Sequence, residues 1–286
     1  MNHPLLILPS PFELECGQVL LLEPPWANPG EIRARLLDAS YPKPFVIDDG
    51  TRRYLYFNVS LMQSAMRLNA PNALDLRYTQ QMMSFLLFHP HPKHIVLIGL
   101  GGGSLLKFCH HRLPGAQFTA VEINPEVIAL REAFLLPPDG TRTRIVEGDG
   151  SAYLVAAPKG IDIVLVDAFD AHGFAPALAN REFIQTIFDK LSGNGVLVIN
   201  LAGEPESYAG LIDEIEQVFA DQVIVFPVPE DGNHILLAFR QFRFEPRWRW
   251  LHNYAKELRA RFDLDFPAFA QKIERAFKKR QRPAPS

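Results

Sequence analysis

Residues 95–104 read Ile-Val-Leu-Ile-Gly-Leu-Gly-Gly-Gly-Ser, a fully apolar run that ends in a glycine-rich turn. An apolar run without polar alternation indicates a strand buried on both faces, as in a parallel sheet covered by helices. Gly99, Gly101 and Gly103 would let the backbone approach a ligand closely, and the following helix would offer free N–H donors. This turn alone is compatible with NAD, FAD or adenosyl cofactors, and also with a tight connection that binds nothing.

The same alternation of strand and helix continues along the chain. Four further apolar strands are predicted at 118–122, 144–146, 161–166 and 195–199. Helix-length segments lie between the strands, at 104–113, 125–135, 150–157 and 180–191. Because crossovers between parallel strands are right-handed, this order predicts an α/β fold with a doubly wound, Rossmann-like sheet.

The end of the predicted sheet points to one branch of such folds. After a helix at about 206–219, two strands at 222–226 and 234–239 are separated by a gap containing Asp231-Gly232. The gap is too short for a crossover helix, so the two strands should pair antiparallel. Such an ending is typical of the methyltransferase type of sheet, which binds a sulfonium cofactor, and is unusual for dinucleotide dehydrogenases.

The flanking segments differ in character from this sheet. Residues 45–47 and 54–57 are rich in β-formers and surround Asp48-Asp49-Gly50, which favours a hairpin turn. We therefore divide the chain into an N-terminal β-hairpin region (1–75), a Rossmann-like cofactor-binding catalytic domain (76–245) and a C-terminal extension (246–286). The rest of the N-terminal region is expected to be short strands and turns, and the extension to be two helices.

Composition narrows the class of protein. Hydrophobic residues make up 48% of the 286 and charged residues 21%, as in a globular protein with a core. Cys16 and Cys109 are far apart, which argues against a disulfide framework or a zinc site, and no metal is expected. Without a secretory signal or an apolar run long enough to cross a bilayer, we expect a cytoplasmic protein with no membrane contact.

Positive charge is concentrated in the C-terminal extension. Residues 241–286 contain twelve Lys and Arg against five Asp and Glu, although the whole chain has a net charge of −3. The run 278–282 could contact nucleic acid, but a solvated helix end is the simpler interpretation. Nucleic acid is therefore not an expected partner.

Acidic residues follow successive predicted strands. Glu122 ends the second strand, where a carboxylate about 20 residues after the glycines can accept hydrogen bonds from ribose hydroxyls. Asp149, beside Gly150, follows the third strand, where it could accept from an adenine amine or simply cap the next helix. Asp167 and Asp170 follow the fourth strand, and such a pair can bind a cationic amine and take its proton.

Taken together, these motifs resemble the spermidine synthase (polyamine aminopropyltransferase) family. The resemblance runs from about Gln63 to Phe239 and is carried by four segments: the approach to the glycine turn at 89–99, Val121-Glu122-Ile123-Asn124, Glu147-Gly148-Asp149-Gly150 and Asp167-Ala168-Phe169-Asp170. The last three of these segments are similar, in that order, to the family's V-E-I-D, G-D-G and D-x-x-D-P motifs.

The resemblance implies a role for each motif. Asp167 would be the proton acceptor, Asp170 an amine-binding carboxylate and Tyr78 a residue beside the amine. Gln63 would contact the cofactor, together with the glycine turn, Glu122 and the Asp149–Gly150 motif. The implied activity is transfer of an aminopropyl group from decarboxylated S-adenosylmethionine to a small amine, by a homodimer.

Departures from the family pattern fall mainly in the amine half of the site. Gly102 stands where the family has an Asp that holds the amine of decarboxylated S-adenosylmethionine and would repel the carboxylate of ordinary S-adenosylmethionine. Thr79 and Gln80 replace a His and a Glu, Ala171 replaces a Pro, and the loop 229–233 lacks the family's polyamine-contacting Tyr. Two alternatives therefore stay open: a methyltransferase that uses ordinary S-adenosylmethionine, and a non-catalytic protein that retains the fold.

Overall fold

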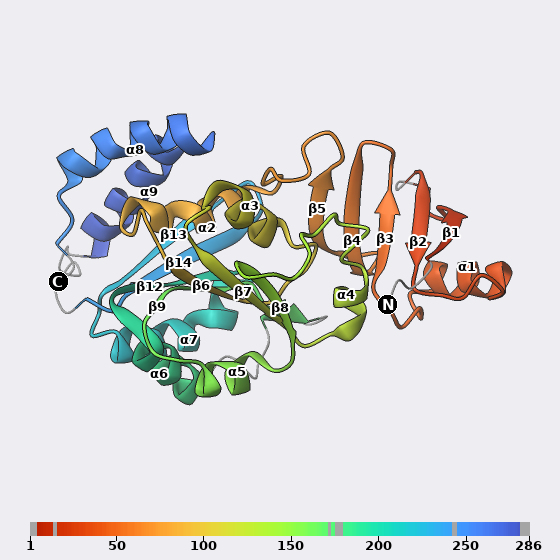
Figure 1. Cartoon of the computed structure of the whole chain (residues 1–286), viewed down its shortest axis with the longest axis horizontal. Helices are drawn as coiled ribbons and strands as arrows, with labels where there is room; N and C mark the ends of the chain where they lie inside the picture. The colour runs from red at the N-terminus through yellow and green to blue at the C-terminus, as the bar shows by residue number, and fades with distance from the viewer. Residues whose placement is uncertain (1–4, 14–15, 171–172, 175–179, 242–244, 281–286) are drawn as a thin grey trace.

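The chain forms two main sheets that lie side by side, with helices packed around the larger one (Figure 1). The computed structural model describes residues 5–13, 16–170, 173–174, 180–241 and 245–280. The N-terminal sheet is antiparallel throughout and has the strand order β1-β2-β3-β4-β5. Its strands are β1 (Leu6–Pro9), β2 (Gln18–Leu21), β3 (Phe45–Asp48), β4 (Arg52–Asn58) and β5 (Leu61–Arg67).

The larger sheet has the order β13-β14-β12-β9-β6-β7-β8. Its strands are β6 (His94–Ile98), β7 (Gln117–Glu122), β8 (Thr143–Glu147), β9 (Ile161–Val166), β12 (Leu191–Leu201), β13 (Val223–Val228) and β14 (Asn233–Phe239). The strands from β8 to β12 pair in parallel, whereas β14 pairs antiparallel with both β12 and β13. The predicted doubly wound, Rossmann-like sheet and its antiparallel ending are both confirmed.

Helices cover both faces of this sheet, which is why its strands lack polar alternation. Side chains of α3 (Ser104–Arg112), η1 (Met83–Leu87), α8 (Trp248–Phe262) and α9 (Phe266–Arg280) pack in one core cluster with alternate residues of β6. Side chains of α5 (Gly150–Ala156), α6 (Arg181–Lys190) and α7 (Pro205–Val218) pack on the opposite face. The first cluster also includes residues of β2 to β5, so the N-terminal sheet shares a core with the larger sheet.

The predicted hairpin between β3 and β4 and the two C-terminal helices α8 and α9 are confirmed. Helix α1 (Pro29–Leu37) lies where turns were expected; Asn28 caps it and Pro29 occupies its first turn. Helix α4 (Pro125–Ala129) is shorter than the predicted 125–135. The division of the chain at residues 75 and 245 remains a prediction.

Two further elements complete the description. Helix α2 (Arg77–Met82) precedes η1, and a short ribbon is formed by β10 (Phe169–Asp170) and β11 (Gly173–Phe174). Among the described residues, no helix combines the length and apolar composition needed to cross a membrane. Arg280, in the basic C-terminal run, pairs with Glu216 at 2.8 Å and with Asp221 at 2.9 Å, so part of that charge is neutralised within the chain.

Candidate active site

The glycine turn after β6 lies directly against the segment that follows β9. Gly99 has φ +90°, and a Cβ placed on it would lie 2.2 Å from the carbonyl oxygen of Asp167. The amide of Asp167 also donates to the carbonyl of Ile98 at 2.9 Å. Only glycine allows both this conformation and this approach, so the turn and the predicted proton acceptor meet at the carboxyl edge of the sheet.

Glu122, at the end of β7, holds the same turn from the other side. Its Oε2 accepts from the amide of Leu100 at 2.8 Å, and its Oε1 accepts from the amide of Asn124 at 2.9 Å. The side chain is 8% exposed. Because each carboxylate oxygen can accept more than one hydrogen bond, these contacts orient Glu122 and leave acceptor capacity for a ribose hydroxyl. Its ribose role remains a prediction.

Asp149 and Gly150 begin α5 at the end of β8. The Oδ1 of Asp149 accepts from the amide of Ala152 at 2.8 Å, so the capping alternative foreseen for Asp149 is realised. A Cβ on Gly150 would lie 2.5 Å from Cγ2 of Ile98, and its absence lets α5 start against β6. Capping and adenine binding are compatible, because the cap uses one lone pair of the carboxylate. The adenine role is still a prediction.

Strand β5 brings Gln63 to the glycine turn. A Cβ on Gly101 would lie 3.8 Å from Cβ of Ser64 and 4.0 Å from the carbonyl oxygen of Gln63. Ser104, which opens α3, donates to the carbonyl of Ala65 at 3.4 Å. The N-terminal sheet therefore contributes one wall of the turn, as expected if Gln63 contacts a cofactor.

The position that departs from the family pattern, Gly102, is packed by other side chains. A Cβ there would lie 2.7 Å from Oγ of Ser64 and 2.9 Å from the ring of Phe134. Lys107 is 1% exposed and donates to the carbonyl of Phe134 at 2.8 Å, and Arg53 donates to the carbonyl of the preceding residue. Lys107 and Arg53 thus hold the segment that places the ring of Phe134 beside the glycine turn. Burial lowers the pKa of Lys107 to about 8.

Asp167 lies in a cluster of polar side chains that come from distant parts of the chain. Asn200 of β12 donates to its Oδ1 at 2.9 Å, and the hydroxyl of Tyr78 donates to its Oδ2 at 3.4 Å. Burial raises the pKa of Asp167 to about 6, although both hydrogen bonds oppose that rise. Burial also raises the pKa of Tyr78, and the nearby Asp167 charge adds to this shift. A carboxylate with this pKa is ionised at neutral pH and can accept a proton.

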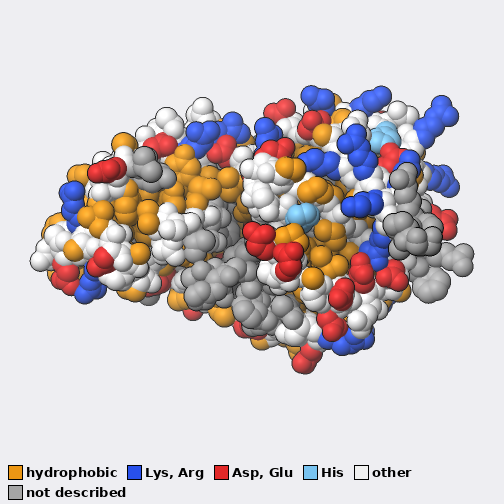
Figure 2. Space-filling view, turned by 180° about the vertical axis from the view of Figure 1, so that it is seen from behind, with side chains coloured by type: hydrophobic (Ala, Val, Ile, Leu, Met, Phe, Trp, Pro, Cys, Tyr) orange, Lys and Arg blue, Asp and Glu red, His pale blue; other side chains and the backbone are white. Residues whose placement is uncertain are grey.

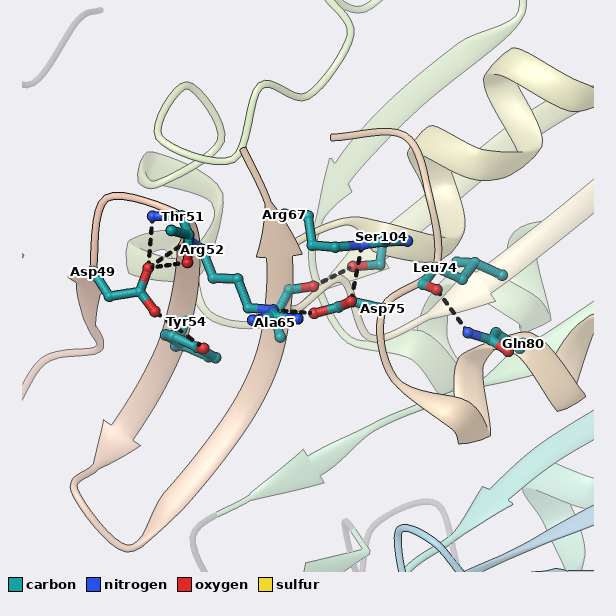
Figure 3. A network of polar contacts seen from close by, with 10 residues as sticks. All are labelled: Asp49, Thr51, Arg52, Tyr54, Ala65, Arg67, Leu74, Asp75, Gln80 and Ser104. Atoms are coloured by element: carbon teal, nitrogen blue, oxygen red, sulfur yellow. Dashed lines mark hydrogen bonds and ion pairs between the residues drawn. The ribbon is translucent and has the colours of Figure 1, made fainter. Parts of the chain in front are cut away.

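Tyr78 is positioned by α2, which is tied to the N-terminal sheet (Figure 3). Asp75, just before this helix, pairs with Arg52 at 2.9 Å and with Arg67 at 3.0 Å. Gln80, where the family has a Glu, donates to the carbonyl of Leu74 at 2.9 Å. This network fixes the start of α2 and uses Gln80 for local structure.

Two of the four predicted acidic residues contact the glycine turn, Glu122 through its carboxylate and Asp167 through its backbone. Asp149 contacts its own helix. The backbone of Asp170 forms part of β10, but its side chain lies outside the described part of the structure, as does Ala171. Within the described ranges, no three His, Cys, Asp or Glu side chains are grouped as metal ligands.

Three contributors were missed from the sequence: Asn200, Asn233 and Asp231. Asn233 donates to Oδ1 of Asn200 at 2.7 Å, and Oδ2 of Asp231 accepts from the amide of Tyr78 at 2.7 Å. A signal existed for Asn200, the one polar residue in the apolar run 196–201 of β12. Asp231 and Asn233 lie in the loop that lacks the family's Tyr, where no motif indicated a role.

Comparison with known proteins agrees with the sequence motifs. Residues 76–234 match the family described as Spermine/spermidine synthase domain. A polyamine aminopropyltransferase of Chromobacterium violaceum is 37% identical over 248 residues, which cover 86% of this chain and 95% of the relative. One of Neisseria meningitidis serogroup B is 34% identical over 236 residues, covering 82% of this chain and 90% of the relative.

Solved structures agree on the fold. A probable spermidine synthase from Corynebacterium glutamicum superposes with a TM-score of 0.63 at 19% identity, covering 73% of this chain and 83% of its own. Human methyltransferase-like protein 13, in complex with SAH, superposes with a TM-score of 0.56 at 20% identity, covering 74% of this chain and 95% of its own. Because the family match spans more than half of the chain and the curated relatives align over most of it, the chain belongs to the spermine/spermidine synthase family, as its motifs predicted.

Proposed function

We propose that this chain transfers an aminopropyl group from decarboxylated S-adenosylmethionine to a small amine. The observation that carries the proposal is the Asp167 carboxylate, which accepts hydrogen bonds from Asn200 and Tyr78 while the backbone of Asp167 lies against the glycine turn. The names of the aligned relatives, polyamine aminopropyltransferases, support the same activity.

The reaction is a single displacement. The acceptor nitrogen attacks the methylene next to the sulfonium, a C–N bond forms, the C–S bond breaks and methylthioadenosine leaves. Because the sulfonium is already a good leaving group, the protein mainly positions the two reactants. Asp167 takes the proton of the acceptor ammonium, which frees the nitrogen lone pair for attack, and Tyr78 lies beside it.

The other site residues are assigned to binding. Glu122 would accept from the ribose hydroxyls of the donor, Asp149 from its adenine amine, and Asp170 would anchor a second ammonium of the acceptor. Gln63, on the strand against Gly101, would contact the donor directly. The carboxylate of Glu122, already oriented by two backbone amides, supports the donor half of this arrangement.

Methyl transfer from ordinary S-adenosylmethionine is the second candidate, and Gly102 favours it. In the family, an Asp at this position would repel the carboxylate of ordinary S-adenosylmethionine, and here that side chain is absent and Ser64 and Phe134 pack against Gly102. The two candidates differ in product, because aminopropyl transfer releases methylthioadenosine and methyl transfer releases adenosylhomocysteine.

Incubation with each donor and a panel of di- and polyamines, read by mass spectrometry, tests the proposal. We expect methylthioadenosine and an aminopropylated amine with the decarboxylated donor only. Asp167→Asn should lose turnover while donor binding, measured by calorimetry, is retained. Asp162→Asn is a matched control, because Asp162 lies at the opposite end of β9 and bonds the amides of 93 and 94 there. Unchanged turnover in Asp167→Asn would reject the assignment.

We also propose that the chain is a homodimer in the cytoplasm. Hydrophobic side chains gather on the surface of the N-terminal sheet (Figure 2). Among the described residues of the N-terminal region, the exposed large hydrophobic ones are Ile7 on β1, Met62 on β5, Leu37 on α1 and Trp26. An apolar surface of this kind supports association between copies. Light scattering across a concentration series would test the dimer, and a mass equal to one chain would reject it.

A further inference from the structure

Three polar side chains form a connected series that ends at Asp167. Asn233, the first residue of β14, donates to Oδ1 of Asn200 at 2.7 Å, and Asn200 donates to Oδ1 of Asp167 at 2.9 Å. Asn200 is 2% exposed and Asn233 is 8% exposed. Buried amides satisfied by each other in this way have one preferred arrangement, because any other leaves a donor or acceptor unpaired.

The charge of Asp167 sets the direction of the whole series. An ionised carboxylate can only accept, so Asn200 must turn its NH₂ group toward Asp167 and its oxygen away. That oxygen in turn requires a donor, which Asn233 supplies. Without Asn233, the Asn200 amide could rotate and present its oxygen to the carboxylate, which would replace an attraction with a repulsion.

The same hairpin also contacts the second residue that touches Asp167. Asp231, two residues before Asn233, accepts from the backbone amide of Tyr78 at 2.7 Å. The first turn of α2 has no capping hydrogen bond from the side chain of its N-cap residue, Leu76. Asp231 supplies an acceptor for one of the N–H groups that this turn leaves without a partner inside the helix. The loop between β13 and β14 therefore orients both partners of the carboxylate.

We propose that Asn200 and Asn233 are positioning residues, with Asn233 acting through Asn200 to hold the Asp167 carboxylate in the geometry that receives the acceptor proton. The catalytic role of this arrangement rests on the proposed aminopropyl transfer. The effect of the two asparagines on the Asp167 carboxylate does not depend on that activity, so the two proposals can be tested separately.

The test uses the full-length protein with Asn200→Ala, Asn233→Ala and the double variant. The control is His234→Ala, which breaks a partly buried polar contact on the same strand, since His234 bonds the hydroxyl of Tyr208 at 2.8 Å. Two quantities are measured: the titration of the Asp167 carboxyl by ¹³C NMR, and kcat/KM for the amine as a function of pH. Among the described residues, the other polar groups that bond to Asp167 or to its partner Tyr78 are the hydroxyl of Tyr78 itself and the carboxylate of Asp231, which accepts from the Tyr78 amide.

Loss of a hydrogen bond to a charged group should move the Asp167 titration upward by about one pH unit, and the acid limb of kcat/KM should move with it. The change in Asn233→Ala should be smaller than that in Asn200→Ala, and the double variant should match Asn200→Ala because Asn233 acts through Asn200. The control should leave the titration where it is. If Asn233→Ala does not fold, Asn233→Leu keeps the branching of the side chain at Cγ, leaves no empty space and still cannot donate.

An unchanged Asp167 titration in the Asn233 variant would overturn the inference, as would additive effects in the double variant. The NMR titration needs no turnover. If the titration shifts but the wild type transfers no aminopropyl group, the proposed function fails while the positioning of the carboxylate stands.

Discussion

Replacement of Asp167 by Asn should make the folded protein more stable at neutral pH while removing its activity. Burial raises the pKa of Asp167 from 3.8 to about 6, so the folded state holds the ionised side chain less favourably than water does. Each pH unit corresponds to about 1.4 kcal/mol, so the ionised carboxylate costs the folded state about 3 kcal/mol. Asn has the same shape, carries no charge and can still accept from Asn200.

The sign of the pH dependence follows from proton counting. Between pH 3.8 and about 6 the folded state binds more protons at Asp167 than the unfolded state, so wild-type stability from this group falls as pH rises through that window. The free energy of unfolding of Asp167→Asn, minus that of the wild type, should therefore increase from about pH 4 to about pH 6 and then level off. Both values come from urea unfolding at each pH.

The difference between the two proteins cancels the other titrating groups, which makes the comparison sensitive to Asp167. If the substitution also alters packing, it adds a constant to the difference in free energy of unfolding and does not change how that difference varies with pH. A difference that stays constant across the window, or that decreases as pH rises, would refute the reasoning, because it would mean that the carboxylate is not destabilised by burial. On the acid side, kcat/KM for the wild type should decrease as the pH falls below about 6, because Asp167 then becomes protonated and can no longer take a proton.

Three further predictions follow from contacts around the glycine turn. Gly102→Asp should destabilise the protein by about 1–3 kcal/mol in urea unfolding, because the new side chain meets Ser64 and the ring of Phe134, and Phe134→Leu should recover part of that loss. The stability of the wild type relative to Lys107→Met should rise as pH increases from about 8 toward 10.5, because the unfolded state binds more protons at Lys107 in that window; a flat profile would contradict the burial of its charge. Asp75→Asn should cost less than about 1 kcal/mol and lose its effect at high salt, because both arginine partners are partly exposed; a large loss that salt does not reduce would contradict this.

The sequence predicted the features of the fold that depend on local pattern. The apolar strands, the glycine turn at 99–103 and the antiparallel ending follow from periodicity and spacing, and all are present. Short strands were expected in the N-terminal region, but the position of β5 was not predicted, because Gln63 and Ser64 interrupt its apolar character and its burial comes from packing against α3. Helix α1 was missed although Asn28 and Pro29 are a recognisable start signal.

The acidic residues at the strand ends of the candidate site could be predicted from the sequence, whereas the contact between the two asparagines beside Asp167 could not. Glu122 and Asp167 follow their strands directly, so the topology of a parallel sheet brings them to one edge. Asn200 and Asn233 are separated by 33 residues and meet only because β12 and β14 pair. No short motif encodes such a contact. The sequence likewise identified Gly102 as a missing Asp, but not Phe134 as the side chain that fills the adjacent space.

The backbone and the carboxylate of Asp167 are held by different parts of the chain. Its backbone is fixed by β6, through the amide bond to Ile98 and the close approach to Gly99, and these contacts set its position relative to the donor turn. Its carboxylate is oriented by Asn200 and Tyr78, which both depend on the β13–β14 hairpin. Substitutions in that hairpin can therefore change how the acceptor amine is handled without moving the donor turn.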